Sequence, residues 1–502
     1  MTGALRRAAS VVLVISAALA ASAHVGTSNA YFEGNAGPYG IRVIVRTPEV
    51  IPGLAQVSVR VTSGGGIERV AVRPLRWDLG LEGAPPPDPA RPVAGDPNLY
   101  SAELWLMTAG SYSVHVDVAG VAGAGTTFVP VLAVAQSRLD MNWAMGAGLF
   151  GAAAFLFVGA LTVFGAAVRE SVLPPGTRPD AGRRTRGRLA TGIGGVVLAL
   201  VCWGGWAWWD NVDAAYLARI YRPPHTVSEI ATANGASRLT LTVDDPSWGG
   251  RTWTPLMPDH GKLMHMFLVK DGDLAAFAHV HPAPVDEASF AVMWPDVPPG
   301  DYRIYADIVH ESGFTQTLVD RVRVSAAPPV AELATPDNGA NGPALVRDPD
   351  DSWSTVRPLG TVSGDRYVLP SARTVRWDRD AAWVADMETS LRFEVTEADG
   401  TPSVLEPYMG MLSHAAMMRD DGSIFVHLHP SGSINMAAQM RFANAEGTDT
   451  HTTGAMRHVL EPKNRVSFPF VFPEPGAYRV FVQVKVGGGV ETAAFDVDVR
   501  DG

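Results

Sequence analysis

The chain has 502 residues, which is enough for about three domains of roughly 150 residues each. Hydrophobic residues make up 47% and charged residues 18%, a composition that excludes a disordered chain. A net charge of −11 argues against nucleic acid as a partner. The single cysteine, Cys202, excludes a disulfide framework and any multi-cysteine zinc or iron–sulfur site.

Residues 1–23 have the features of a secretory signal peptide. Arg6 and Arg7 precede an apolar run that ends near Ala20, and Ala21-Ser22-Ala23 follows as a small-x-small cleavage site. Cleavage after Ala23 would make His24 the mature N-terminus.

Residues 24–136 alternate between apolar and polar side chains in short runs such as Gln56–Val61 and Tyr112–Val118. Glycine and proline clusters separate these runs, and no helical periodicity of useful length occurs outside the two long apolar runs described next. This pattern predicts an Ig-like antiparallel β-sandwich.

Two uncharged runs follow, residues 143–168 and 189–209. Each is long enough to cross a bilayer as a helix, and neither has a polar face that would suit a buried core helix. The connector, residues 169–188, carries six arginines against Glu170 and Asp180, and a basic short loop is retained in the cytoplasm. We therefore expect a transmembrane helical hairpin in a bacterial cytoplasmic membrane, with both flanking parts extracytoplasmic and the lipid bilayer as a partner.

The C-terminal half contains an internal duplication. The pattern from Leu256 to His265 aligns without a gap on that from Leu405 to His414. A hairpin turn and a His-x-His-Pro motif follow in both copies, and a Gly-x-Tyr turn opens a later strand at Gly300 and Gly476, as it does at Gly110 in the N-terminal domain. The predicted units are sandwich repeats at residues 225–325 and 353–500, joined by a linker at 326–352. The acidic cluster in this linker, Asp348, Asp350 and Asp351, suits a flexible connection better than a calcium loop. All-β Ig-like sandwiches, three in number, plus the two-helix hairpin form the expected fold.

Histidines concentrate in these repeats, since eleven of the 13 lie between His225 and His458. In a strand, residues i and i+2 share a face, and the preceding strand folds back beside them. Counting from the turn places His265 beside His279 and His281, and His414 beside His427 and His429. His260 and Met409 occupy equivalent positions of the two copies. The candidate metal ligands are therefore His260, His265, His279, His281, Met409, His414, His427 and His429.

Imidazole and thioether are both copper ligands, and 12 of the 16 methionines fall in the same half of the chain. Copper is therefore the expected metal, and zinc held by three histidines and a water is the alternative. His310, His451 and His458 are candidate fourth ligands. A separate Cu(II) site is predicted at a mature N-terminal His24, whose α-amine and ring would form a histidine brace with His115.

The segment from His265 to Pro282, followed by Pro299–Asp307, resembles the YtkA-like Ig-fold modules of exported bacterial proteins, which often accompany copper or heavy-metal handling genes. The N-terminal domain is similar to CopC-like sandwiches in its Ig-type pattern and His24. The resemblance implies a metal-handling context, with other exported metal-handling proteins as partners.

These features predict a membrane-anchored extracytoplasmic metal-binding protein that serves in copper capture, delivery or resistance. The sequence has no Walker A loop, HExxH or GxSxG motif, so we expect no enzyme, with copper-dependent oxidation open only through a histidine brace. The alternatives are an Ig-like envelope scaffold or interaction protein with structural histidines, and a metal or pH sensor, although the short connector leaves no room for a cytoplasmic output domain.

Overall fold

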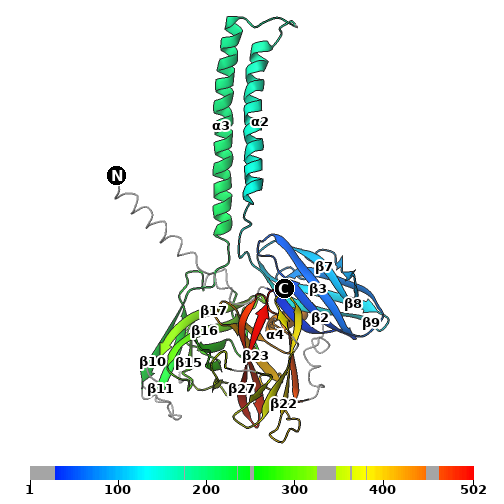
Figure 1. Ribbon diagram of the computed structural model, residues 1–502, viewed down its shortest axis with the longest axis vertical. Coiled ribbons are helices and arrows are strands. Elements are labelled where there is room, and N and C mark those ends of the chain that lie inside the picture. The colour runs from blue at the N-terminus through cyan, green and yellow to red at the C-terminus, as the bar shows by residue number, and fades with distance from the viewer. Residues whose placement is uncertain are drawn as a thin grey trace. The chain divides into compact units, whose positions relative to one another are not determined.

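The computed structural model describes residues 29–174, 176–233, 236–248, 254–324, 346–361, 364–379, 382–447 and 463–502. Within these ranges the protein consists mainly of β-strands with three α-helices (Figure 1). The described residues within 1–133 and 223–502 form one compact unit, and those within 134–222 form another. The predicted signal peptide (residues 1–23), His24, His451, His458 and most of the predicted linker lie outside the described residues.

The N-terminal domain forms two antiparallel sheets, with strand orders β1-β2-β3-β7-β6 and β5-β4-β8-β9. In β3, Ala55, Val57 and Val59 are buried while the residues between them are more exposed, which is the alternation of a strand with one face on a core. The strands are β1 (Ala30–Ala36), β2 (Tyr39–Arg46), β3 (Gly53–Ser63), β4 (Ile67–Arg76), β5 (Asp88–Pro89), β6 (Arg91–Val93), β7 (Asp96–Leu106), β8 (Gly110–Gly120) and β9 (Gly123–Ala133).

The first repeat also has two sheets, an outer one of order β10-β11-β15-β14 and an inner one of order β17-β16-β12-β13-β18. They share a core in which Leu241 and Phe290 of the outer sheet join Met266, Leu268 and Ile304 of the inner sheet. The strands are β10 (Thr226–Ala233), β11 (Ala236–Val243), β12 (His265–Lys270), β13 (Ala276–Val280), β14 (Ala283–Pro284), β15 (Ser289–Met293), β16 (Gly300–Val309), β17 (Thr315–Val324) and β18 (Ser352–Thr355).

The second repeat has the same plan. Its outer sheet has the order β19-β20-β22-β25 and its inner sheet β21-β27-β26-β23-β24, with Trp377 and Phe393 packing on Met417, Val480 and Phe495. The strands are β19 (Arg366–Val368), β20 (Thr374–Asp378), β21 (Trp383–Val384), β22 (Glu388–Thr396), β23 (Ser413–Arg419), β24 (Phe425–Leu428), β25 (Arg465–Val471), β26 (Gly476–Val486) and β27 (Gly489–Arg500), and the helix α4 spans Met436–Ala445.

The three Gly-x-Tyr turns have a common structure. Gly110, Gly300 and Gly476 begin their strands with φ of 146°, 151° and 143°, a region that side chains with a Cβ rarely enter. The hydroxyls of Tyr302 and Tyr478 donate to the carbonyls of Pro298 and Glu474, at 2.6 and 2.7 Å. Each of these tyrosines thus ties its strand to the turn four residues earlier, as in a tyrosine corner.

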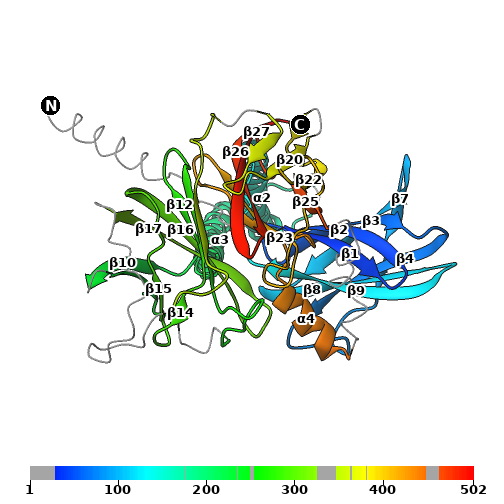
Figure 2. The same cartoon turned by 90° about the horizontal axis from the view of Figure 1, so that it is seen from below.

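The inner sheets of the two repeats pack on each other, so both faces of each are buried (Figure 2). Phe277 of β13 stacks on Phe481 of β26, with ring centroids 4.3 Å apart, and in the reverse sense Phe425 of β24 stacks on Tyr305 of β16 at 4.1 Å. These two contacts join equivalent positions of the duplication and relate the repeats by an approximate two-fold axis. The duplicated repeats therefore form an interface with each other through equivalent residues of their inner sheets.

Three features differ from the sequence analysis. The strand β18, placed at the junction of the predicted linker and second repeat, pairs with β13 and extends the inner sheet of the first repeat, where it covers an otherwise open edge. The helix α4 was not predicted, because its ten residues are too few to show a periodicity; Asn435 caps it by accepting from Ala438 N. The helix after the connector begins at Ala181, so most of the predicted connector arginines belong to a helix.

The unit Val134–Arg222 contains two long apolar helices, α2 (Trp143–Glu170) and α3 (Ala181–Leu217), which run side by side (Figure 1). Their large apolar side chains are mostly exposed, as with Phe155 at 78% and Trp208 at 65%. Gly165 and Gly187 are the buried residues of α2 and α3, and a Cβ on Gly165 would lie 2.4 Å from Thr191 Oγ1. Both helices are long and apolar enough to cross a membrane.

The stacked aromatic pairs should dominate the stability of the interface between the repeats. Phe277→Ala removes a fully buried ring, and we expect it to lower the free energy of unfolding by about 3–5 kcal/mol. Urea denaturation of the full chain in detergent, followed by near-UV circular dichroism, measures this change. Val368→Ala, at a 66% exposed position, is the control and should change it by less than about 0.5 kcal/mol. Equal effects of the two substitutions would contradict a packed interface.

Candidate metal centre

Strand alternation directs the histidines to the interface between the inner sheets. In β12, Met266 and Leu268 face the core of their own repeat, so His265 shares the opposite face with Phe267. The same alternation places His279 beside Phe277, and in the second repeat it directs His414 and His427 to the interface. Two clusters expected on separate hairpins therefore meet as one.

The histidine cluster, as we call it, contains seven imidazoles. Neighbouring ring centroids lie between 4.4 and 6.3 Å apart. The side chains of His260, His281 and His427 are at most 7% exposed, and His279 and His414 are completely buried. The members are His260, His265, His279, His281, His414, His427 and His429.

The register corrects one detail of the predicted hairpins. Met266 pairs with Val280, so His265 lies across from His281, and His279 is its diagonal neighbour. The centroid distances from His265 are 5.1 Å to His281 and 5.4 Å to His279, so all three rings still converge.

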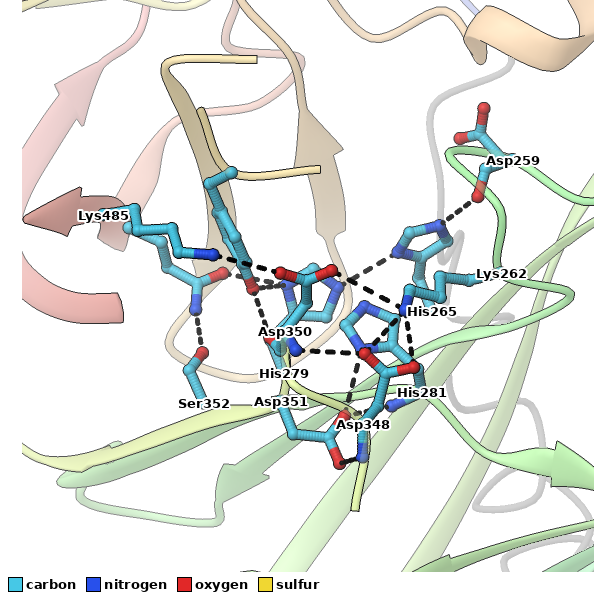
Figure 3. A network of polar contacts seen from close by, with 12 residues as sticks. Asp259, Lys262, His265, His279, His281, Asp348, Asp350, Asp351, Ser352 and Lys485 are labelled. Atoms are coloured by element: carbon cyan, nitrogen blue, oxygen red, sulfur yellow. Dashed lines mark hydrogen bonds and ion pairs between the residues drawn. The ribbon is translucent and has the colours of Figure 1, made fainter. Parts of the chain in front are cut away.

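The hydrogen-bond partners of two facing rings favour the tautomers in which the facing nitrogens carry no hydrogen. His265 Nε2 lies 3.2 Å from the carbonyl oxygen of Asp259, which can only accept, so Nε2 carries the hydrogen and Nδ1 has a lone pair. His279 Nδ1 lies 2.9 Å from Gln483 Oε1, whose amide nitrogen donates to Ser352, so His279 Nε2 also has a lone pair. Figure 3 shows the rings of His265 and His279 facing each other, with a dashed line between their facing nitrogens.

These two lone pairs, on His265 Nδ1 and His279 Nε2, are 3.2 Å apart. Neutral imidazoles in this arrangement repel each other, and a cation between them removes the repulsion. Nitrogen ligands at about 2.0–2.1 Å from a tetrahedral metal ion are themselves about 3.3 Å apart. The spacing of the two nitrogens thus suits coordination of a shared ion.

Six other ring nitrogens of the cluster are buried and make no hydrogen bond within the described parts of the chain. His414 has neither of its nitrogens paired. Native proteins leave few buried polar atoms unpaired, and an unpaired one indicates a ligand, an ion or a water. The atoms are Nε2 of His260, His281, His427 and His429, and both Nδ1 and Nε2 of His414.

Two non-overlapping sets of three histidines could each hold a metal ion. The first triad is His265, His279 and His281, and the second triad is His260, His414 and His429. Within each triad the candidate ligand atoms lie within 4.8 Å of one another. The second triad crosses the interface, because His260 belongs to the first repeat and the other two residues to the second.

Acidic residues that were predicted to lie in a flexible linker instead orient the first triad. Asp351 Oδ1 lies 3.0 Å from His281 Nδ1 and also accepts from the backbone nitrogen of His281, at 2.8 Å. A carboxylate on one nitrogen leaves the other, here Nε2, as the ligand atom. Asp348 joins His281 and Asp351 in a third candidate group, and Lys262 Nζ pairs with Asp348 at 2.6 Å (Figure 3). The sequence marked these carboxylates only as an acidic cluster of a linker, and it did not connect them with the histidines because their partners are distant in sequence.

The approximate two-fold relation extends into the cluster, with specific exceptions. Asp307 and Gln483 occupy equivalent strand positions, and each faces a histidine of the opposite repeat: Gln483 contacts His279, and Asp307 Oδ2 lies 3.4 Å from His427 Nδ1. His260 and Met409 both adopt a left-handed backbone, with φ of 51° and 49°, but only His260 supplies an imidazole. Met409 is buried at the equivalent position of the second repeat.

Burial controls the charge of the cluster. It lowers the pKa of His265, His279, His414 and His429 well below the usual value, and neighbouring imidazoles add to the effect. The pKa of His427 falls to about 3 for the same reasons. Burial raises the pKa of Asp307 to about 6, although the hydrogen bond from Thr317 lowers it. These five rings are therefore neutral, which is the state that binds metals.

The other predicted ligands lie elsewhere. His115 is buried in β8, with Nδ1 3.4 Å from Asp117 Oδ2 and its ring against Phe128, while its predicted partner His24 is outside the described residues. His310 Nδ1 contacts the carbonyl of Thr254 and its ring packs near Trp248. Met264, Met266, Met417 and Met418 are buried in the hydrophobic cores, so packing accounts for these methionines.

Comparisons with known proteins identify one family model. Residues 224–326 and 371–501 match a family described as a domain of unknown function (DUF8832), and the two stretches coincide with the two repeats. No curated protein matches the chain.

Solved structures with similarity to the chain include three adhesion or multidomain proteins. A tetra-tandem repeat from the extending region of a large adhesion protein is 11% identical and has a TM-score of 0.16, with coverage of 90% of this chain and 72% of that one. The FN1–FN3 domains of chicken CNTN1 are 9% identical (TM-score 0.13, coverage 91% and 97%). Salmonella alpha-2-macroglobulin reacted with methylamine is 8% identical (TM-score 0.19, coverage 93% and 24%). At these TM-scores the similarities carry no argument about fold or function.

The low pKa values predict an acid-sensitive protein in the absence of metal. Each of the five shifted histidines binds a proton more readily when unfolded, so its contribution to stability is present above pH 6.5 and is lost as the pH falls below it. The loss is at most about 1.4 kcal/mol per pH unit for each ring. The raised pKa of Asp307 has the opposite effect, because it stabilises the folded state as the pH falls, but it is one group against five. Urea denaturation of the metal-free full chain between pH 7 and 5 should show a steep fall, and a flat profile would contradict neutral buried rings.

Asp351 should matter for metal affinity although it touches only His281. Asp351→Asn removes the carboxylate that orients this ring, and we expect metal affinity to fall about 10–100-fold. Competition against a chromophoric chelator measures the affinity. Asp244→Asn is the matched control, because Asp244 is 76% exposed and remote from the cluster. An unchanged affinity in Asp351→Asn would contradict a role of the Asp351 carboxylate in metal binding through His281.

Proposed function

We propose that this chain is an extracytoplasmic, membrane-anchored protein that binds copper in the histidine cluster and serves in copper capture, delivery or resistance. In this proposal α2 and α3 form a transmembrane hairpin in a bacterial cytoplasmic membrane, and the signal peptide exports the N-terminal domain. Three Ig-like sandwiches, the two repeats being YtkA-like, then lie outside the membrane. The arginines of residues 169–188 and the apolar surfaces of both helices support this topology.

The observation that carries metal binding is the set of buried ring nitrogens without hydrogen-bond partners, together with the facing lone pairs of His265 and His279. A cluster with only a structural role would pair these nitrogens, because each unpaired one costs about 1–3 kcal/mol. The hydrogen bonds of His265, His279, His281 and His429 to Asp259, Gln483, Asp351 and Ile434 hold the rings in fixed orientations, as metal ligands require.

Copper is preferred on the chemistry of the donors. Both triads consist of imidazole, and among first-row divalent ions Cu²⁺ binds nitrogen sites most tightly. Zinc is the closest competitor. Met264, Met266, Met417 and Met418 are core residues and do not add thioether ligands, so the argument for copper rests on the histidines.

Metal binding is tested on the full chain in detergent, stripped with a chelator, loaded with copper or zinc, and freed of unbound metal by dialysis. Replacing His279, His281, His427 and His429 by Ala should abolish tight binding, and copper should displace zinc from the unaltered protein. His225→Ala is the control, since its side chain is 68% exposed and outside the cluster. Near-zero metal in both unaltered and altered protein would reject the proposal in favour of an Ig-like scaffold with structural histidines.

A further inference from the structure

We propose that the histidine cluster is a two-ion centre, in which the first triad and the second triad each bind one metal ion and His427 lies between them. This inference rests on the proposed function and adds the number of ions, their ligands and their proximity.

The rings within each triad lie closer together than rings of different triads. Centroid distances are 4.8–5.4 Å within the first triad and 5.1–5.5 Å within the second. The contacts that join one triad to the other are longer: His260 to His265 is 6.2 Å and His279 to His414 is 6.3 Å. The imidazoles therefore form two groups that touch, each with its own set of converging ligand atoms.

One ion cannot use this many ligands. A tetrahedral ion takes four, and a three-histidine site with one open position is an established arrangement. Seven buried imidazoles exceed that number by three, and unpaired nitrogens occur in both triads, on His281 in the first and on His260, His414 and His429 in the second. A single ion in either triad would leave the unpaired nitrogens of the other unexplained.

His427 belongs to neither triad and contacts both. Its ring lies 4.4 Å from His429 and 5.6 Å from each of His265, His279 and His414. Its Nε2 is buried without a partner. An additional imidazole at this position supplies a ligand at the boundary between the two ions.

Carboxylates beside the rings reduce the repulsion between two neighbouring cations. Asp351 contacts His281 of the first triad, Asp259 Oδ2 lies 3.7 Å from His260 Nε2 in the second, and Asp307 faces His427. Asp259 and Asp351 have side chains only 3% exposed, so solvent screens them little. Each part of the cluster thus has a negative group nearby.

The number of bound ions tests the inference. The full chain in detergent is stripped, loaded with Zn²⁺, and desalted, and metal per chain is measured by mass spectrometry; Zn²⁺ is counted because the separate site predicted at His24 and His115 is a Cu(II) site. We expect two ions in the unaltered protein, one in His260→Asn, one in His281→Phe and none bound tightly in the double variant. Asparagine tolerates the left-handed backbone of His260, and phenylalanine retains a ring at His281, so both variants are designed to fold. His225→Ala should retain two ions.

Electron paramagnetic resonance of the Cu²⁺-loaded protein gives an independent measurement. Two neighbouring Cu²⁺ ions should give a magnetically coupled spectrum, which each single variant converts to that of an isolated ion. One ion in the unaltered protein, lost in either variant, would overturn the two-ion centre while leaving metal binding intact. No bound metal would reject the proposed function itself. Two ions with uncoupled spectra would overturn their proximity.

Discussion

The inner sheets of the two repeats are buried on both faces, and this packing positions everything else in the C-terminal half. One face of each sheet covers the core of its own repeat, and the other meets the partner sheet through the Phe277–Phe481 and Tyr305–Phe425 stacks. Because successive residues of a strand point to opposite faces, the positions that alternate with core residues must enter this interface. The histidines occupy those positions at one end of the stacked sheets, where aromatic packing gives way to polar side chains.

Burial of seven imidazoles is unfavourable unless their ring nitrogens find hydrogen-bond partners or a ligand. The interface keeps five of the rings neutral, and it fixes several rings through a hydrogen bond to one nitrogen while the other nitrogen is left unpaired. Hydrophobic side chains of similar size would stabilise the interface more. The buried ring nitrogens that have no hydrogen-bond partner are the chemical basis of the metal-binding proposal. Carboxylate and amide side chains orient two rings of the cluster, His281 and His279.

The approximate two-fold relation explains why the cluster has two halves, and its exceptions explain why the halves differ. His260 is matched by Met409, Asp307 by Gln483, and Asp259 by Tyr408. The first triad lies beside Asp348 and Asp351, whereas the second triad draws His260 from the first repeat and its other two ligands from the second. A duplicated sequence has become a centre with unequal environments, in which two ions would be distinguishable by affinity.

Local patterns were enough to predict the β-rich repeats, the two apolar helices, the duplication and the seven histidines, since strand alternation and hydropathy are local properties of the chain. They also predicted that each hairpin gathers three rings. It is the packing of the two repeats that brings the two sets of histidines together, adds His260 to the second triad, and places Asp351 and Gln483 beside the rings. These contacts join residues up to 204 positions apart, as between His279 and Gln483, and depend on how two sheets pack, which no local pattern records.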